Sequence, residues 1–201
     1  MKTEIRSLKF IFIEMQEEIK KIIEVLRAGG VILYPTDTVW GLGCDATNEK
    51  AVKRVFDIKK RADAKAMLVL IDNPSKLQSY VDEVPDMAWD LIELSEKPLT
   101  IIYPTAKNLA SNLIAEDKTI GIRVTKETFS KNLCAQFRKP IVSTSANISG
   151  SATPVNFSQI ADEIKLAVDY VVSYRQDDLS KGLPSSIIKL GKGGVFQLIR
   201  E

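Results

Sequence analysis

Apolar residues near the start of the chain repeat at helical spacing and then give way to a strand-like run. Residues 14–28 carry apolar side chains three or four positions apart, which predicts an amphipathic helix, and Gly29 and Gly30 supply a stop signal. Residues 31–34 are an apolar run closed by Pro35, which predicts a short buried strand. The chain therefore opens with a helix followed by a strand.

The rest of the chain alternates the same two patterns. Helices are expected after the N-cap residue Asn48, in two segments between Pro74 and Leu94, at residues 128–137 and near residues 158–166. Strands are expected at residues 67–71, 99–103, 120–124 and 141–142, and near Tyr170, Ile187 and Phe196. Because helices and strands interleave, the fold class is α/β. Some strands lie too close in sequence for a helical crossover, which favours a mixed sheet.

Composition is that of an ordinary folded protein, with 45% hydrophobic and 27% charged residues in 201. No internal repeat, low-complexity stretch or long linker divides it, so we expect a single domain over residues 1–201. The formal net charge is only +2, and there is no long run of like charges. These features argue against a protein that coats nucleic acid, but they leave a local basic pocket open.

The chain has two cysteines, Cys44 and Cys134, and no histidine. This inventory excludes the usual tetrahedral zinc site and any Ser-His-Asp triad. It fits two buried thiols in a reducing compartment. The apolar segment at residues 8–13 is too short for an export signal, and no run reaches the length of a membrane span. We therefore expect a soluble, cytoplasmic protein without a membrane partner.

Familiar nucleotide motifs are absent or poorly placed. The chain contains no P-loop sequence. Gly41, Gly43 and Ala46 loosely match a dinucleotide fingerprint, but the match begins several residues after the preceding strand, which breaks the geometry that the motif needs. Residues 191–194 lie between the last two strands and are typical of a hairpin turn.

Two polar clusters follow predicted elements in the first third of the chain. The loop at residues 35–43 carries Thr36, Asp37 and Thr38 at the end of a strand, where α/β sheets collect ligands. An ordinary side-chain-stabilised turn is the alternative. The basic cluster at residues 59–65 has the positive charge that a triphosphate requires, although basic residues at a helix end also serve as dipole partners.

A third polar cluster, residues 143–147, directly follows the predicted strand at residues 141–142. Its hydroxyls and its Asn147 amide are suited to a phosphate, a carboxylate or a nucleobase. A helix N-cap cluster is the alternative. None of the three clusters decides the function alone.

Together, these segments resemble the YrdC-like family of threonylcarbamoyl-AMP synthases over nearly the whole chain. The resemblance is carried, in the family's order, by residues 34–45, 59–65, 98–102, 121–124, 143–147, 184–188 and 198–200. It implies a three-layer α/β fold with a twisted mixed sheet flanked by helices.

The resemblance also implies a reaction. L-threonine, bicarbonate and ATP would give threonylcarbamoyl-adenylate and pyrophosphate, with Mg²⁺ carried by ATP and no protein-bound metal. Partner proteins would then use the adenylate to modify tRNAs that read ANN codons. Direct binding of tRNA or double-stranded RNA stays open.

Roles follow from the resemblance, position by position. The family's catalytic signature falls on Lys59, Arg61, Ser145 and Asn147. ATP contacts are expected from Arg61, Lys65, Asn147 and Arg200, and threonine contacts from Thr36, Thr38, Arg123, Ser143 and Ser185. An arginine suits the threonine carboxylate.

The sequence departs from the family pattern at several positions. Ala62 follows Arg61 where many relatives have proline, and Trp40 stands where tyrosine is common. The sequence also ends soon after Arg200, which suggests the short form of the family that relies on separate transfer proteins.

Three other functions remain open. One is a carbamoyl-adenylate-forming relative, although such domains usually belong to much larger chains. The others are a sister branch of uncertain activity and an RNA-binding module of the same fold without synthase activity.

Overall fold

The computed structural model describes residues 2–61, 67–191 and 195–201, with side chains described from residue 12 onward. The helices are α1 (Lys2–Arg27), α2 (Glu49–Lys59), α3 (Leu77–Tyr80), α4 (Asp86–Leu94), α5 (Thr128–Phe137) and α6 (Asp162–Ala167). The strands are β1 (Ile32–Tyr34), β2 (Gly41–Gly43), β3 (Leu68–Ile71), β4 (Leu99–Tyr103), β5 (Ile120–Val124), β6 (Ile141–Ser145), β7 (Tyr170–Val171), β8 (Ser186–Leu190) and β9 (Phe196–Arg200). Short 3-10 turns lie at Pro74–Lys76, Ser111–Leu113 and Phe157–Gln159.

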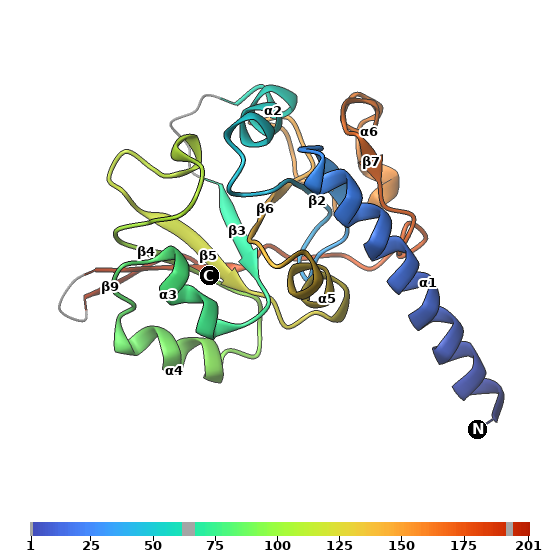
Figure 1. Cartoon of the computed structure of the whole chain (residues 1–201), viewed down its shortest axis with the longest axis horizontal. Coiled ribbons are helices and arrows are strands. Elements are labelled where there is room, and N and C mark those ends of the chain that lie inside the picture. The colour runs from blue at the N-terminus through green and yellow to red at the C-terminus, as the bar shows by residue number, and fades with distance from the viewer. Residues whose placement is uncertain (1, 62–66, 192–194) are drawn as a thin grey trace.

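All of these strands form one sheet in the order β7-β1-β2-β6-β3-β5-β4-β8-β9. The pairs β1–β7, β3–β5 and β4–β8 are parallel, and the other neighbouring pairs are antiparallel. Figure 1 shows the twisted sheet with helices packed around it: α2 and α6 lie towards the top of the view, and α3 and α4 lie at the lower left. The expected three-layer α/β fold with a mixed sheet is confirmed.

Helix ends follow the expected local chemistry. The Asn48 side chain caps α2 by accepting from the backbone N–H groups of Lys50 at 3.1 Å and Ala51 at 3.2 Å. Lys60 closes the same helix in the left-handed conformation, with φ at 49°. The bounds of α5 match the predicted 128–137, and α4 begins directly after Pro85. Local sequence signals therefore set these helices.

Several expectations about element bounds were wrong. Helix α1 begins at Lys2 rather than near residue 14, so the apolar segment at residues 8–13 belongs to it. Residues 41–43, expected in a loop, form β2, and β6 continues through Ser145. Pairing explains both changes, because Gly41 lies opposite Ser145 in the β2–β6 ladder.

Three further predictions concern residues 41–46, helix α6 and the turn between the last two strands. Since residues 41–43 are a strand, they do not form the tight strand-turn-helix of a dinucleotide site. Helix α6 is shorter than expected and follows the 3-10 turn at Phe157–Gln159. A hairpin turn was expected at residues 191–194, of which residues 192–194 lie outside the described residues. The flanking strands β8 and β9 do pair antiparallel.

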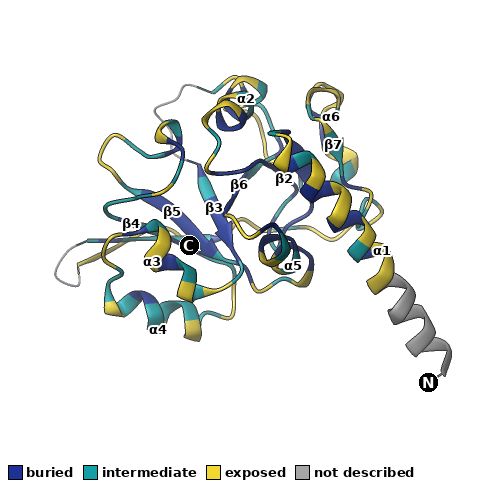
Figure 2. Cartoon of the chain, viewed as in Figure 1, coloured by how far each residue is buried: buried dark blue, intermediate teal, exposed yellow. Residues whose placement is uncertain are grey.

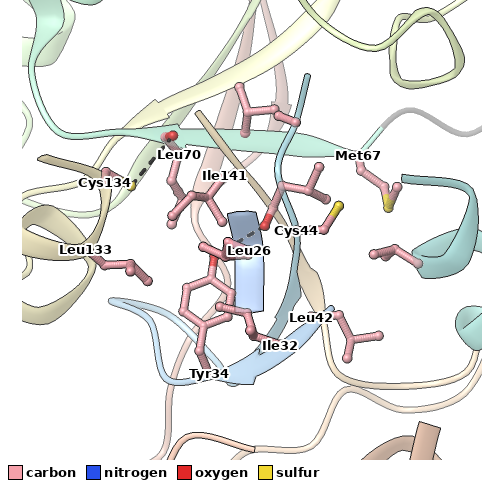
Figure 3. Packing of buried hydrophobic residues seen from close by; sticks show 14 of the residues in the cluster. Leu26, Ile32, Tyr34, Leu42, Cys44, Met67, Leu70, Leu133, Cys134 and Ile141 are labelled. Carbon is pink, nitrogen blue, oxygen red and sulfur yellow. Dashed lines mark hydrogen bonds between the residues drawn. The ribbon is translucent and has the colours of Figure 1, made fainter. Parts of the chain in front are cut away.

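The core lies on and around the central strands, which are dark blue in Figure 2. Cys44 and Cys134 are free and buried in it, as predicted, and burial raises the pKa of both thiols. Figure 3 shows them among apolar side chains, with the Cys134 thiol donating to the Leu70 carbonyl at 3.8 Å. Within the described residues, no helix is long and apolar enough to cross a membrane.

Candidate active site

A cavity of about 250 Å³ opens at one edge of the central strands. Its wall combines residues from widely separated segments, namely Thr38, Val39, Gly41, Arg61, Met67, Leu68, Arg123, Ser143, Thr144, Ser145, Thr153, Pro184, Ser185, Ile187 and Arg200. All three polar clusters found in the sequence contribute to this wall. The sheet therefore brings together groups that are far apart along the chain.

Strand pairing explains how these groups meet. In the β2–β6 ladder, Gly41 lies opposite Ser145. A side chain at Gly41 would place its Cβ 3.1 Å from the Thr144 carbonyl, so the glycine permits this close approach. The antiparallel β8–β9 pair sets Arg200 opposite Ile187, which returns the end of the chain to the cavity.

Three arginines, Arg61, Arg123 and Arg200, line the cavity. Burial lowers the pKa of Arg61, and burial together with the charge of Arg123 lowers the pKa of Arg200. These shifts mean that the guanidinium groups of Arg61 and Arg200 are poorly hydrated, and that Arg200 lies close enough to Arg123 for their charges to repel. The described residues of the wall include no Asp or Glu. The cavity is therefore suited to a polyanion.

Hydroxyl groups surround these arginines. Ser143, Thr144 and Ser145 come from β6, and Ser185 precedes β8. The Ser185 hydroxyl lies 2.9 Å from that of Thr100, and its carbonyl accepts from Nε of Arg200 at 2.9 Å. Ser185 and Arg200 are thus held together as one part of the wall.

Thr153 also lines the cavity and was not predicted from the sequence. It lies in an irregular segment after β6, outside the 143–147 cluster. A lone threonine in such a segment gives no pattern that would single it out. The fold of the loop after β6 brings it to the wall.

Thr36 lies beside the cavity rather than in its wall. Its hydroxyl donates to the Val39 carbonyl at 2.7 Å and accepts from the backbone N–H of Thr38 at 3.1 Å. The two threonine hydroxyls are 3.0 Å apart. Thr36 therefore shapes the turn that presents Thr38 to the cavity.

Like Thr36, Lys59 does not line the cavity. The side chain is buried, with 2% of the residue exposed, and its ammonium donates to the backbone carbonyls of Ser145 and Asn147, the latter at 2.8 Å. Burial, with a further contribution from the charge of Arg61, lowers the pKa of Lys59 to about 8. Lys59 thus ties the end of α2 to the end of β6.

Asn147 does not line the cavity in this structure. Its side-chain amide donates to the carbonyls of Ile148 at 3.0 Å and Ser151 at 2.7 Å, while Oδ1 is buried with no hydrogen-bond partner among the described residues. The amide holds the turn after β6. Lys65, predicted to contact ATP, lies outside the described residues.

Sequence comparison identifies the family. The Sua5/YciO/YrdC family model, which carries the description telomere recombination, matches residues 24–201. A threonylcarbamoyl-AMP synthase of Pseudoalteromonas translucida is 37% identical over 185 residues, which cover 90% of this chain and 98% of that protein.

Solved structures of the same family share the fold. P. abyssi Sua5 complexed with L-threonine superposes with a TM-score of 0.76 at 26% identity, over 86% of this chain and 50% of that one, so this chain spans about half the length of P. abyssi Sua5. E. coli YciO superposes with a TM-score of 0.80 at 28% identity, over 92% of this chain and 89% of that chain. From its sequence, its fold and the motifs that line its cavity, the chain belongs to the Sua5/YciO/YrdC family.

Proposed function

We propose that this protein is an L-threonylcarbamoyladenylate synthase, which converts L-threonine, bicarbonate and ATP into threonylcarbamoyl-AMP and pyrophosphate. The observation that carries the proposal is a cavity with three arginines, several hydroxyls and no carboxylate among its described wall residues. The 37% identity to a threonylcarbamoyl-AMP synthase supports it, as does the L-threonine complex of P. abyssi Sua5.

Different residues of the cavity wall suit ATP and threonine, the two larger substrates. Arg61, Arg200 and Ser145 suit the phosphates of ATP, and Lys65 would add another charge. For threonine, Arg123 suits the carboxylate, and hydroxyls of Thr38, Ser143 and Ser185 are available as hydrogen-bond partners. Apart from Lys65, which lies outside the described residues, the groups in both assignments line the same cavity.

The chemistry needs positioning and charge stabilisation more than covalent help from the protein. The threonine amine adds to bicarbonate with loss of water and gives a carbamate. A carbamate oxygen attacks the α-phosphorus, the bond from that phosphorus to the β-phosphate oxygen breaks, and pyrophosphate leaves. Arg61 and Arg200 would stabilise the charge that develops on pyrophosphate. This route needs no histidine.

Mg²⁺ fits this proposal as an ion carried by ATP. In the described part of the chain, no group of three or more Cys, Asp or Glu side chains is arranged to hold a metal. When bound to the triphosphate, Mg²⁺ would neutralise phosphate charge and help to fix its geometry. The protein's own contribution is the set of arginines and hydroxyls.

Lys59 and Asn147 support the site indirectly in this proposal. Lys59 holds the carbonyls of Ser145 and Asn147, and the Asn147 amide holds the turn that follows. They thereby fix the Ser145 hydroxyl at the cavity. The adenylate then passes to separate transfer proteins that modify ANN-decoding tRNAs.

Pyrophosphate release tests the proposal. Purified protein is supplied with ATP, Mg²⁺, L-threonine and bicarbonate, and each substrate is omitted in turn. We expect release only with the complete mixture. Release supported by carbamoyl phosphate without threonine would indicate the carbamoyl-adenylate relative. Salt-sensitive RNA binding with no release would indicate the RNA-binding module. Either result would overturn the synthase assignment.

A further inference from the structure

We propose that Asp37 is a positioning residue of the active site, whose carboxylate holds the guanidinium of Arg123 in the cavity wall from behind. The proposal rests on the proposed function for the identity of the substrate that Arg123 binds. Asp37 lies between Thr36 and Thr38, in the turn after β1.

The geometry places the carboxylate on the far side of the arginine. Nη2 of Arg123 lies 3.0 Å from Oδ1 of Asp37, and the two side chains are only 3% and 11% exposed. Arg123 lines the cavity with the hydroxyls, whereas Asp37 lines a second cavity of about 290 Å³, together with Leu99 and Glu127. The ion pair therefore forms part of the partition between the two cavities.

Asp37 is the charged group that fixes this arginine. Among the described residues, Arg123 makes no other ion pair, and its Nε has no hydrogen-bond partner. Oδ1 of Asp37 also lacks a hydrogen bond of good geometry, so the contact is electrostatic. A buried guanidinium needs a counter-charge, and here Asp37 provides it while leaving donors of Arg123 for a substrate carboxylate.

The turn itself is built to hold Asp37. Thr36 accepts from the N–H of Thr38 and donates to the Val39 carbonyl, which closes the turn around Asp37. Thr38 then faces the cavity and Asp37 faces the back of Arg123. The three consecutive residues thus have separate tasks: Thr36 shapes the turn, Asp37 positions the arginine and Thr38 lines the wall.

This arrangement predicts a selective effect on threonine. The proposed phosphate contacts Arg61 and Arg200 make no ion pair with Asp37 among the described residues, so ATP binding should be little affected. In Asp37→Asn, Arg123 loses its counter-charge and its fixed orientation. We expect the KM for threonine to rise about tenfold to a hundredfold, the range for a lost charge-assisted contact. The KM for ATP should stay within about threefold, which is close to no change in binding free energy.

Steady-state pyrophosphate release measures both KM values for wild type, Asp37→Asn and Asp37→Glu. The glutamate variant keeps the charge and should recover part of the threonine affinity. Asp45→Asn is the matched control, because Asp45 is also buried and ion-paired, to Lys139 at 2.6 Å, but does not line the cavity. Thermal unfolding checks that each variant is folded.

A selective rise in the threonine KM, partly restored by glutamate, supports the proposal. An unchanged threonine KM in folded Asp37→Asn, or an equal change in both KM values as in a general loss of stability, overturns it. If Asp37→Asn does not fold, Asp37→Glu decides, because its longer side chain should still raise the threonine KM alone.

Threonine calorimetry without ATP separates this proposal from the proposed function. If wild type releases no pyrophosphate, the synthase assignment fails, and calorimetry then tests the positioning role directly. Weaker threonine binding by Asp37→Asn than by wild type would support the role of Asp37. Equal binding by the two proteins, or none by wild type, would overturn it.

Discussion

Lys59 shows how much of this site is built from groups that do not face its cavity. The ammonium is buried and makes two hydrogen bonds to backbone carbonyls, of Ser145 and Asn147. Burying a cation is unfavourable unless such contacts compensate for lost hydration. The lowered pKa of about 8 shows that compensation is incomplete. Lys59 therefore orders the site at some cost in stability.

The destabilising effect of burying the Lys59 ammonium should become smaller as the pH rises. Because the pKa of Lys59 falls from 10.5 to about 8 on folding, the folded protein releases the Lys59 proton at lower pH than the unfolded chain does. The contribution of Lys59 to stability therefore increases between about pH 8 and pH 10, by at most about 1.4 kcal/mol per pH unit.

Urea unfolding of wild type and Lys59→Met across this range measures the effect. The difference in unfolding free energy, wild type minus variant, should rise with pH. The same substitution at the neighbouring Lys60, whose side chain is 65% exposed, provides the control. A difference that is flat or falls with pH would contradict the account of Lys59.

At the residue scale, the sequence predicted which segments meet at the cavity better than it predicted the direction of each side chain. Arg61, Arg123 and Arg200 all line the cavity, as their expected roles require. Thr36 and Lys59 belong to the same motifs but point away from it, because their polar atoms bond to nearby backbone. A motif shows which residues belong together, whereas the direction of each side chain depends on the backbone around it.

At the element scale, the irregular segment at residues 177–185, called the strap here, closes one side of the cavity. Within it, Gly182 lies directly against the turn after β1: a Cβ on Gly182 would be 1.7 Å from the carbonyl oxygen of Thr38. The strap continues into Pro184 and Ser185, which line the cavity. Glycine at this position therefore allows the strap to reach the wall.

Replacing Gly182 with alanine should displace the strap from the turn. Backbone atoms cannot yield as a flexible side chain would, so we expect kcat/KM for pyrophosphate release to fall about tenfold or more, the scale of a small misplacement in an active site. Global stability should change less, since most residues of the strap are exposed to solvent. Kinetics and thermal unfolding measure the two effects.

Gly191→Ala is the matched control for this substitution. Among the described residues, a Cβ there would meet its nearest atoms, both of Val195, at 3.6 Å, which is an ordinary contact distance. It should leave turnover close to that of wild type. Full activity in Gly182→Ala would show that the strap does not set the geometry of the wall.

Elements were predictable where their signals are local. The bounds of α5 were predicted because its apolar residues repeat at helical spacing. In the structure, the Glu127 side chain caps this helix by accepting from the backbone N–H groups of Phe129 and Ser130. Strand β2 was missed, because Gly41–Gly43 has no strand-like side-chain pattern and owes its conformation to pairing with β1 and β6. Pairing partners distant in sequence leave little trace in a local pattern.

At the scale of the whole molecule, the cavity exists because β6 lies between β2 and β3. This placement brings the 143–147 cluster next to the turn after β1 on one side and β3 and β5 on the other. Spacing along the chain predicted a mixed sheet, but not this strand order. The net charge of +2 likewise gave no sign of a cavity with three arginines.

The most direct test of the account is to follow radiolabelled bicarbonate into threonylcarbamoyl-AMP with wild type and Arg61→Ala. Arg61 lines the cavity at the end of α2 and is proposed to contact the phosphates of ATP. We predict a labelled product that requires threonine and ATP, and a loss of about a hundredfold or more in the variant, as for other electrostatic contacts to a transition state. No labelled product from folded wild type, or equal amounts from the two proteins, would contradict the account.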